Sequence, residues 1–274
     1  MHDQVVMQVR AWAEAQRLGA LWSPLVHTVT TWIASAAPAH ATVEQRLLAC
    51  LDLGTCFFLL DDATDDARAR HDDLEHVASG GSPVAHRPLQ GAFAALFARL
   101  SSWGSLAHYL ALRVEFARAL RVRERIRSGA AIDLEGYLAL REITIYFGPW
   151  LSTWQLLDGC ELSPRERAAV APAFAPANRW QVLENERLSV ARDQVAGTPN
   201  LIAMLAAQRG DSLATASAEV RTWADADLDA YTAAVLALRK GPLTTPVASY
   251  LTLLEAGVDG AIHHYKGADA ARYR

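Results

Sequence analysis

The sequence has few cysteines, no long apolar run and no surplus of basic residues, and each lack excludes a class of protein. Three cysteines in 274 residues are too few for a disulfide scaffold and fit a reducing compartment. No apolar run reaches the ~20 residues of a membrane-spanning helix, and the first residues lack the pattern of a secretory signal. A net charge of -4 argues against nucleic-acid binding. We therefore expect a cytoplasmic protein with no membrane span and no nucleic-acid partner.

The alternating patterns typical of β-strands are also missing, and the residues that are present favour helices. Hydrophobic residues make up 51% of the chain and charged residues 20%, which excludes a disordered protein. Apolar residues recur three and four positions apart between short breaks rich in Gly and Pro. No linker is long or polar enough to separate two domains. The sequence therefore predicts an all-α protein, a single bundle of about ten helices forming one domain over residues 1–274.

An apolar helical segment runs directly into four carboxylates within residues 57–66, FFLLDDATDD. On a helix Asp61 and Asp65 lie one turn apart on the same face, with Asp62 beside them. Like charges at this spacing repel each other, and a bound cation would relieve the repulsion. Oxygen ligands without a nearby thiolate or histidine pair favour a hard ion, Mg²⁺ or Mn²⁺ rather than Zn²⁺. A solvated acidic helix end would give the same pattern, so both interpretations stay open at this point.

A second group of polar residues follows about 120 residues later, within residues 185–193, NERLSVARD. Asn185, Ser189 and Asp193 are spaced at i, i+4 and i+8, so they stack along one face of a helix. Their amide, hydroxyl and carboxylate oxygens are suitable ligands for one hard cation. The alternative is three unrelated polar residues on an exposed face. Asn and Ser are mediocre helix residues, however, and no structural need explains both in mid-helix.

Together the two motifs resemble the metal-binding motifs of bacterial class I terpene synthases. The first motif of that family is DDxxD and the second is (N/D)DxxSxx(K/R)E, and the chain has DDATD and NERLSVARD. The metal ligands that the resemblance implies are Asp61, Asp62, Asp65, Asn185, Ser189 and Asp193.

The second motif departs from the family pattern at two positions. Glu186 replaces the usual Asp, at a position that is not a metal ligand in the family. Asp193 replaces the usual Glu, which shortens one ligand by a methylene group and would loosen that metal. Arg192 matches the basic residue that contacts the diphosphate.

A further segment, residues 137–144, resembles the YxxxRxxT motif that carries the diphosphate-sensing arginine in bacterial members of the family. The resemblance makes Arg141 that arginine and places Thr144 beside it. Gly148-Pro149 is expected to break the following helix, because proline removes a backbone donor and clashes with the preceding turn. In the family, this unwound backbone points a carbonyl at the reacting carbon. Ile145 stands where the family has a small effector residue, so the effector assignment stays open.

The chain ends in a sequence that matches the C-terminal RY pair of the family, whose two side chains grip the diphosphate. Here the pair is Arg272 and Tyr273. Aromatic faces stabilise a nearby cation, and the cavity of such an enzyme needs them. Phe57 lies one turn before Asp61 and is expected to face the same cavity, deeper in the bundle.

The resemblance implies the class I terpenoid synthase fold, a catalytic helical domain around a central apolar cavity. It implies an enzyme that ionises a linear prenyl diphosphate, first of all farnesyl diphosphate (C15), to diphosphate and a cyclised terpene through carbocations. Its cofactor would be Mg²⁺, as three ions, with Mn²⁺ as an alternative. The resemblance also implies a homodimer. The implied catalytic residues are Arg141, Thr144 and Phe57, and the implied diphosphate-binding residues are Arg141, Arg192, Arg272 and Tyr273.

Other functions stay open on the sequence. A diterpene synthase would take geranylgeranyl diphosphate or a bicyclic diterpenyl diphosphate. A chain-elongating prenyltransferase needs a second Asp-rich motif, and the only other acidic pair in the first half of the chain, Asp72-Asp73, follows the first motif in a loop-like stretch. A non-enzymatic helical module would explain the helices. It would not explain why Arg141, Arg192 and Arg272 recur at the intervals of the family.

Overall fold

The computed structural model describes residues 2–19, 30, 31, 33, 34, 36–53, 71–84, 87–127 and 132–266. Within these ranges the chain forms α-helices and no β-strand, which confirms the all-α fold class. None of the described helices is long and apolar enough to cross a membrane. The helices are α1 (His2–Ala15), α3 (Val43–Leu53), α5 (His71–Ala78), α6 (Pro88–Leu100), α7 (Leu106–Arg127), α8 (Leu134–Thr144), α9 (Phe147–Asp158), α10 (Pro164–Ala196), α11 (Leu201–Arg209), α12 (Leu213–Arg239) and α13 (Thr245–Lys266).

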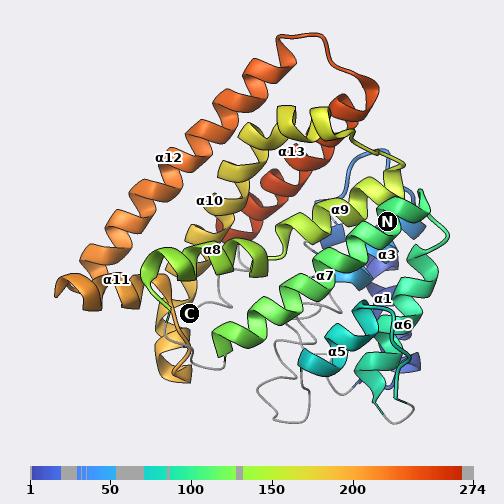
Figure 1. The fold of residues 1–274 in the computed structure, drawn as a ribbon, viewed down its shortest axis with the longest axis horizontal. Coiled ribbons are helices and arrows are strands. Elements are labelled where there is room, and N and C mark those ends of the chain that lie inside the picture. Colours follow the sequence, from blue (N-terminus) through green and yellow to red (C-terminus); the bar gives the residue numbers. More distant parts are fainter. Residues whose placement is uncertain are drawn as a thin grey trace.

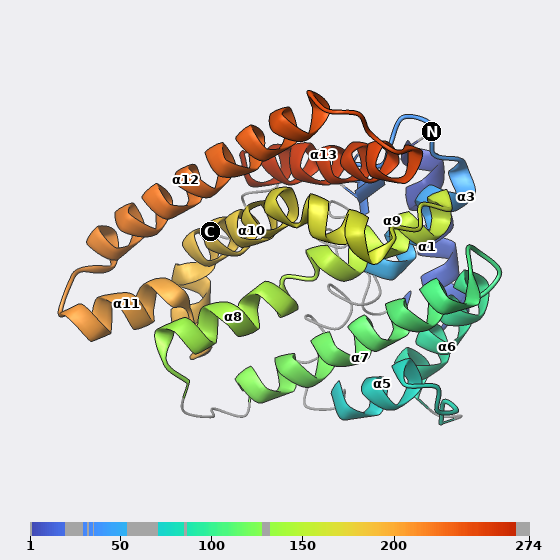
Figure 2. The same cartoon turned by 45° about the horizontal axis from the view of Figure 1, so that its top comes forward.

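The helices pack into two groups that meet along α8 and α9 (Figure 1). In one group the long helix α10 packs against α12 and α13, and in the other α7 packs against α5, with α6 beside α5. Figure 2 shows α12 and α13 on one side of the molecule and α5 to α7 on the opposite side. Helix α8 contacts both α7 and α10, so its side chains can reach the polar face of α10.

Helix α10 carries the second polar motif, and local sequence defines both of its ends. Ser163 caps the first turn in a capping box, because its side chain accepts from the backbone of Glu166 while the Glu166 carboxylate accepts from the backbone of Ser163. At the other end Gly197 adopts the left-handed conformation, with φ of 66°, which glycine reaches without strain. The helix of 33 residues is thus long enough to carry both core residues and the motif.

The break before α9 lies earlier than the sequence predicted. Helix α8 ends at Thr144, and the chain turns through Ile145 and Tyr146, whose φ is 72°. The predicted break at Gly148-Pro149 is therefore wrong. Pro149 lies in the first turn of α9, where a missing N–H costs nothing because the first donors of a helix have no partner within it. A left-handed non-glycine residue is a rare conformation, and only the packing around it can maintain it.

A second prediction fails at residues 72 and 73. The loop-like stretch expected there belongs to helix α5, which runs from His71 to Ala78.

An aromatic cluster packs α9 against α10 and α13. Phe147 stacks on Trp150 at 5.8 Å between ring centroids, and on Phe174 of α10 at 6.0 Å. Helix α13 comes close to this cluster at Gly257, where an added Cβ atom would lie 2.4 Å from Trp150 Cζ3 and 2.8 Å from Phe147 Cε2. Only glycine allows this approach, so Gly257 sets the distance between α13 and α9.

Candidate functional site

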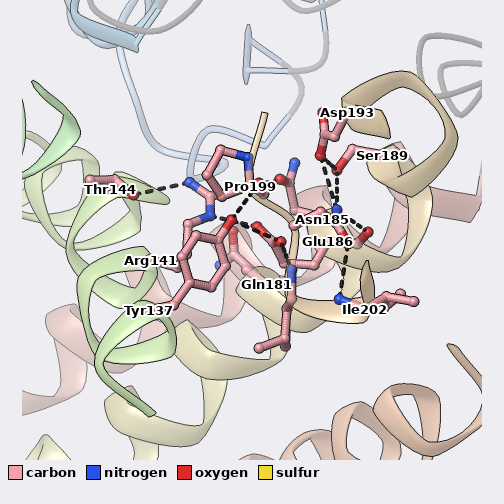
Figure 3. Close-up of polar contacts among 12 residues, drawn as sticks. Tyr137, Arg141, Thr144, Gln181, Asn185, Glu186, Ser189, Asp193, Pro199 and Ile202 are labelled. Carbon is pink, nitrogen blue, oxygen red and sulfur yellow. Dashed lines mark hydrogen bonds and ion pairs between the residues drawn. The ribbon is translucent and has the colours of Figure 1, made fainter. Parts of the chain in front are cut away.

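The polar residues of α8 and α10 face each other and form one continuous hydrogen-bond network (Figure 3). Helix α8 contributes Arg141 and Thr144, and α10 contributes the motif residues of positions 185–193. A further hydrogen bond joins the two helices, because Asn178 Nδ2 of α10 donates to the carbonyl oxygen of Glu142 of α8 at 2.9 Å.

Arg141 lies at the centre of this network and uses all three of its guanidinium nitrogens. Nε donates to Glu186 Oε1 at 2.5 Å, Nη2 to Asn185 Oδ1 at 2.9 Å and Nη1 to Thr144 Oγ1 at 3.0 Å. Burial by itself would lower the pKa of Arg141, but the charge and hydrogen bond of Glu186, together with Tyr137 and Asp193, raise the pKa above its ordinary value. The structure therefore holds a permanent positive charge beside the second motif.

Glu186 is the first of two residues of this network to which the sequence assigned no partner. Its side chain is only 2% exposed. One carboxylate oxygen, Oε1, bonds to Arg141, and the other, Oε2, accepts from the backbone N–H of Leu201 at 2.7 Å and from the hydroxyl of Tyr137 at 3.1 Å. Burial raises the pKa of Tyr137, which keeps this hydroxyl protonated. Glu186 thus positions Arg141 and also anchors the start of α11.

One signal in the sequence was available for Glu186. It lies one turn after Val182 and Leu183 on α10, both of which are fully buried in the core. A carboxylate on an apolar helix face requires a buried cation or several donors. That pattern predicts a partner but does not identify it.

Two of the motif residues of α10, Ser189 and Arg192, donate to the carboxylate of Asp193. Ser189 donates to Asp193 Oδ2 at 2.6 Å, and the neighbouring Arg192 donates to Asp193 Oδ1 at 3.0 and 3.2 Å. Asn200, at the start of α11, donates from Nδ2 to Asp193 Oδ2 at 3.0 Å, and to Ser189 Oγ at 3.4 Å. The second residue that sequence reasoning missed is therefore Asn200, which holds two of the predicted ligands in place while its own oxygen caps α11.

The donor set on α10 suits a hard divalent cation. Asn185, Ser189 and Asp193 offer one amide, one hydroxyl and one carboxylate oxygen, and the side chains of Ser189 and Asp193 already lie within hydrogen-bonding distance of each other. Within the described ranges, no group of three or more His, Cys, Asp or Glu side chains is placed to bind a metal. A cation on this helix would depend on the Asn and Ser oxygens as well as the carboxylate.

The other predicted site residues lie outside the part of the chain that the structure describes. They are Phe57, Asp61, Asp62, Asp65, Arg272 and Tyr273. Their roles, and the meeting of the two metal motifs, stay predictions.

An apolar cavity adjoins this network at the break between α8 and α9. Its lining residues are Ile33, Ala36, Ile145, Tyr146, Phe147, Trp150, Gln181 and Gly257. Of the aromatic residues of α9, Phe147 and Trp150 line this cavity. Trp180, in contrast, packs against Tyr265 of α13 with ring centroids 6.0 Å apart.

Comparison with known proteins gives one family match. The model of terpene synthase family 2, C-terminal metal binding, matches residues 52–229. No curated protein matches the sequence at a significant level.

Solved structures share the fold at low sequence identity. The linalool/nerolidol synthase of Streptomyces clavuligerus is 21% identical with a TM-score of 0.80, and the match covers 96% of this chain and 95% of that one. Its complex with 2-fluorogeranyl diphosphate matches at 20% identity with a TM-score of 0.80, over 97% and 94% of the two chains. The germacradien-4-ol synthase of Streptomyces citricolor is 21% identical with a TM-score of 0.80, over 96% and 93%.

Proposed function

This chain belongs to terpene synthase family 2 and is an enzyme of that family, and we propose that it ionises a linear prenyl diphosphate to diphosphate and a cyclised terpene. Farnesyl diphosphate is the proposed substrate. The observation that carries the proposal is the position of Arg141, whose guanidinium bonds to the first residue of the second metal motif while a buried carboxylate fixes its orientation.

Ionisation of an allylic C–O bond places negative charge on the departing diphosphate, and the enzyme must stabilise that charge. Arg141 is suited to this because its planar fork matches phosphate oxygens and its charge is permanent. In Arg141, Nε donates to the carboxylate of Glu186, whereas Nη1 donates to Thr144 and Nη2 to Asn185. Exchange of these two neutral partners for diphosphate oxygens would leave the ion pair with Glu186 intact. Arg192, Arg272 and Tyr273 are the further proposed diphosphate contacts.

Asn185, Ser189 and Asp193 would hold one divalent cation, and Asp61, Asp62 and Asp65 would hold the others. Mg²⁺ is the proposed ion, as three ions. When bound, it supplies positive charge that stabilises the leaving diphosphate. Asn200 keeps Ser189 and Asp193 together before any cation binds.

The carbocation left by ionisation must be kept from bulk water. Phe147 and Trp150 line the adjoining cavity. An aromatic face that reaches a nearby cation stabilises it by roughly 0.5–2 kcal/mol. Phe57 is proposed to face the same cavity from the helix that precedes the first motif.

The proposal is tested by incubating the purified enzyme and Mg²⁺ with the C10, C15 and C20 prenyl diphosphates and analysing extracts by gas chromatography. Asp61→Ala and Asn185→Ala are expected to abolish turnover while circular dichroism shows an intact helical fold. Arg141→Lys keeps the charge beside Glu186 but loses the fork, and is expected to lower kcat/KM by about 10²-fold or more. The matched control is Arg121→Lys on α7. The Arg121 side chain is exposed and pairs with Glu75 at the surface, so turnover is expected to stay unchanged.

Retained activity in both Asp61→Ala and Asn185→Ala would refute the metal assignment. Absence of product from every one of the three diphosphates with the unaltered enzyme would refute the proposed function itself.

A further inference from the structure

The solvent-facing side of α7 is apolar over consecutive turns of the helix. Leu106, Leu110 and Val114 are 71%, 50% and 68% exposed. Their spacing of four residues places them on one side of α7, and the exposed small residues Ala107 and Ala111 lie beside them. These five residues form the α7 stripe, which presents most of its apolar surface to solvent.

Other exposed apolar side chains occur singly. In the described part of the chain, the remaining exposed large apolar residues belong to four different segments and are Met7, Val84, Val195 and Leu236. A single exposed apolar residue is normal on a protein surface, whereas a contiguous patch marks an interaction site. The α7 stripe is such a patch, and the proposed reaction makes no use of it.

The α7 stripe has the symmetry that contact with a second copy of this chain requires. A two-fold axis brings one surface against itself, so every residue of the surface must find a suitable partner within the same surface. With the axis at Leu110 and the two α7 helices antiparallel, Leu110 of each copy meet, and Leu106 of one copy meets Val114 of the other. Helices that cross at about 20° stay in contact over such a length.

Charges at the two ends of the α7 stripe are complementary under the same two-fold axis. Arg118 is exposed one turn after Val114, about 12 Å from Leu110 along the helix at 1.5 Å per residue. At the other end, the exposed Glu161 accepts from the hydroxyl of Ser105 at 3.2 Å, and Ser105 lies about 7.5 Å before Leu110. The axis therefore brings Arg118 of one copy to the end that carries Glu161 of the other, within reach of the long arginine side chain.

We propose that this enzyme forms a homodimer through an antiparallel contact of the two α7 stripes, with ion pairs between Arg118 of each copy and Glu161 of the other. The resemblance to the family implied a dimer but no surface for it, and the α7 stripe supplies that surface. A contact of about three helical turns buries less than the roughly 800 Å² per partner of a standard interface. We therefore expect a weak dimer, with a Kd of about 1–100 µM.

Sedimentation velocity of the full chain over this concentration range measures the association. In the unaltered protein, the fraction of dimer is expected to rise with concentration. Leu110→Glu places two carboxylates at the two-fold axis and is expected to raise the Kd by about tenfold or more. The matched control is Leu236→Glu on α12, the same change at an isolated residue that is 56% exposed, and its Kd is expected to stay unchanged. Circular dichroism should show an intact helical fold in both variants, because both positions are exposed.

Charge reversal tests how the two copies are arranged. Arg118→Glu and Glu161→Arg each bring like charges together, and each is expected to raise the Kd by about tenfold. The double variant Arg118→Glu with Glu161→Arg restores opposite charges, so its Kd is expected to return to within about threefold of the unaltered value. A double variant that associates as weakly as the single variants would overturn the antiparallel contact.

Three further outcomes would overturn the inference. The first is an unaltered protein that stays monomeric over this range, and the second is a dimer that Leu110→Glu leaves intact, which would place the interface on another face. The third is a monomeric protein that co-sediments with vesicles of anionic phospholipid and loses this binding in Leu110→Glu, which would make a lipid surface the occupant of the α7 stripe. None of these measurements involves turnover, so the proposed function is tested separately.

Discussion

The buried ion pair between Arg141 and Glu186 allows stability and activity to be separated by experiment. Glu186→Leu removes the carboxylate and leaves the guanidinium of Arg141, whose side chain is 18% exposed, without its charged partner. It also leaves the backbone N–H of Leu201 without an acceptor. Removing one partner of a buried pair costs about 3–5 kcal/mol in the free energy of unfolding. With about 2–4 °C per kcal/mol for a chain of this size, Tm is expected to fall by roughly 6–20 °C.

The double variant Arg141→Met with Glu186→Leu removes both charges and is expected to recover much of that stability, because apolar residues can replace a buried pair with little loss. Its activity should not recover, since the diphosphate contact is gone. The free energy of unfolding is measured by urea denaturation and Tm by thermal denaturation, both followed by circular dichroism, and activity by product formation from the preferred diphosphate.

An exposed pair of the same type serves as the control. Arg10 and Glu14 lie 3.2 Å apart with side chains 61% and 58% exposed, so Glu14→Leu should lose less than about 1 kcal/mol of ion-pair stabilisation. Two results would contradict the stability assigned to the buried pair. One is a loss of unfolding free energy in Glu186→Leu as small as that in Glu14→Leu, and the other is a double variant no more stable than Glu186→Leu alone.

Two further predictions concern neighbouring elements. Gly257→Ala is expected to destabilise the fold by about 1–3 kcal/mol and to change the product mixture, because the new methyl group would meet Trp150 Cζ3 at 2.4 Å. The control is Gly91→Ala in α6, where nothing lies within 4 Å of the Cβ position. That change should be neutral or stabilising by up to about 1 kcal/mol. Similar losses in unfolding experiments on both variants would contradict the close approach. Asn200→Ser keeps a capping oxygen for α11 but removes the donor to Asp193, and is expected to weaken binding of Mg²⁺ with diphosphate by about 10–100-fold in calorimetric titration. An affinity equal to that of the unaltered protein would show that Asp193 needs no such support.

The sequence alone determined the features that depend on local spacing. The helical class follows from the three- and four-residue periodicity, and Ser163 with Glu166 marks the start of α10 as a capping box does. The alignment of Asn185, Ser189 and Asp193 follows from helix geometry once α10 is a helix. These properties involve residues within about two turns of each other, so no knowledge of the rest of the molecule is needed.

Only the tertiary structure decided which residues meet across the molecule. Glu186 pairs with Arg141, 45 positions earlier in the chain, and with the backbone of Leu201, and no spacing rule relates these positions. The break at Ile145 and Tyr146 was likewise set by packing, since Pro149 fits the first turn of α9 and the left-handed Tyr146 is buried against the ring of Phe116. A buried charge or a strained residue is stable only when the surrounding helices compensate for it. That compensation comes from segments distant in sequence, which is why periodicity identified the helices of this protein and only their packing determined its site.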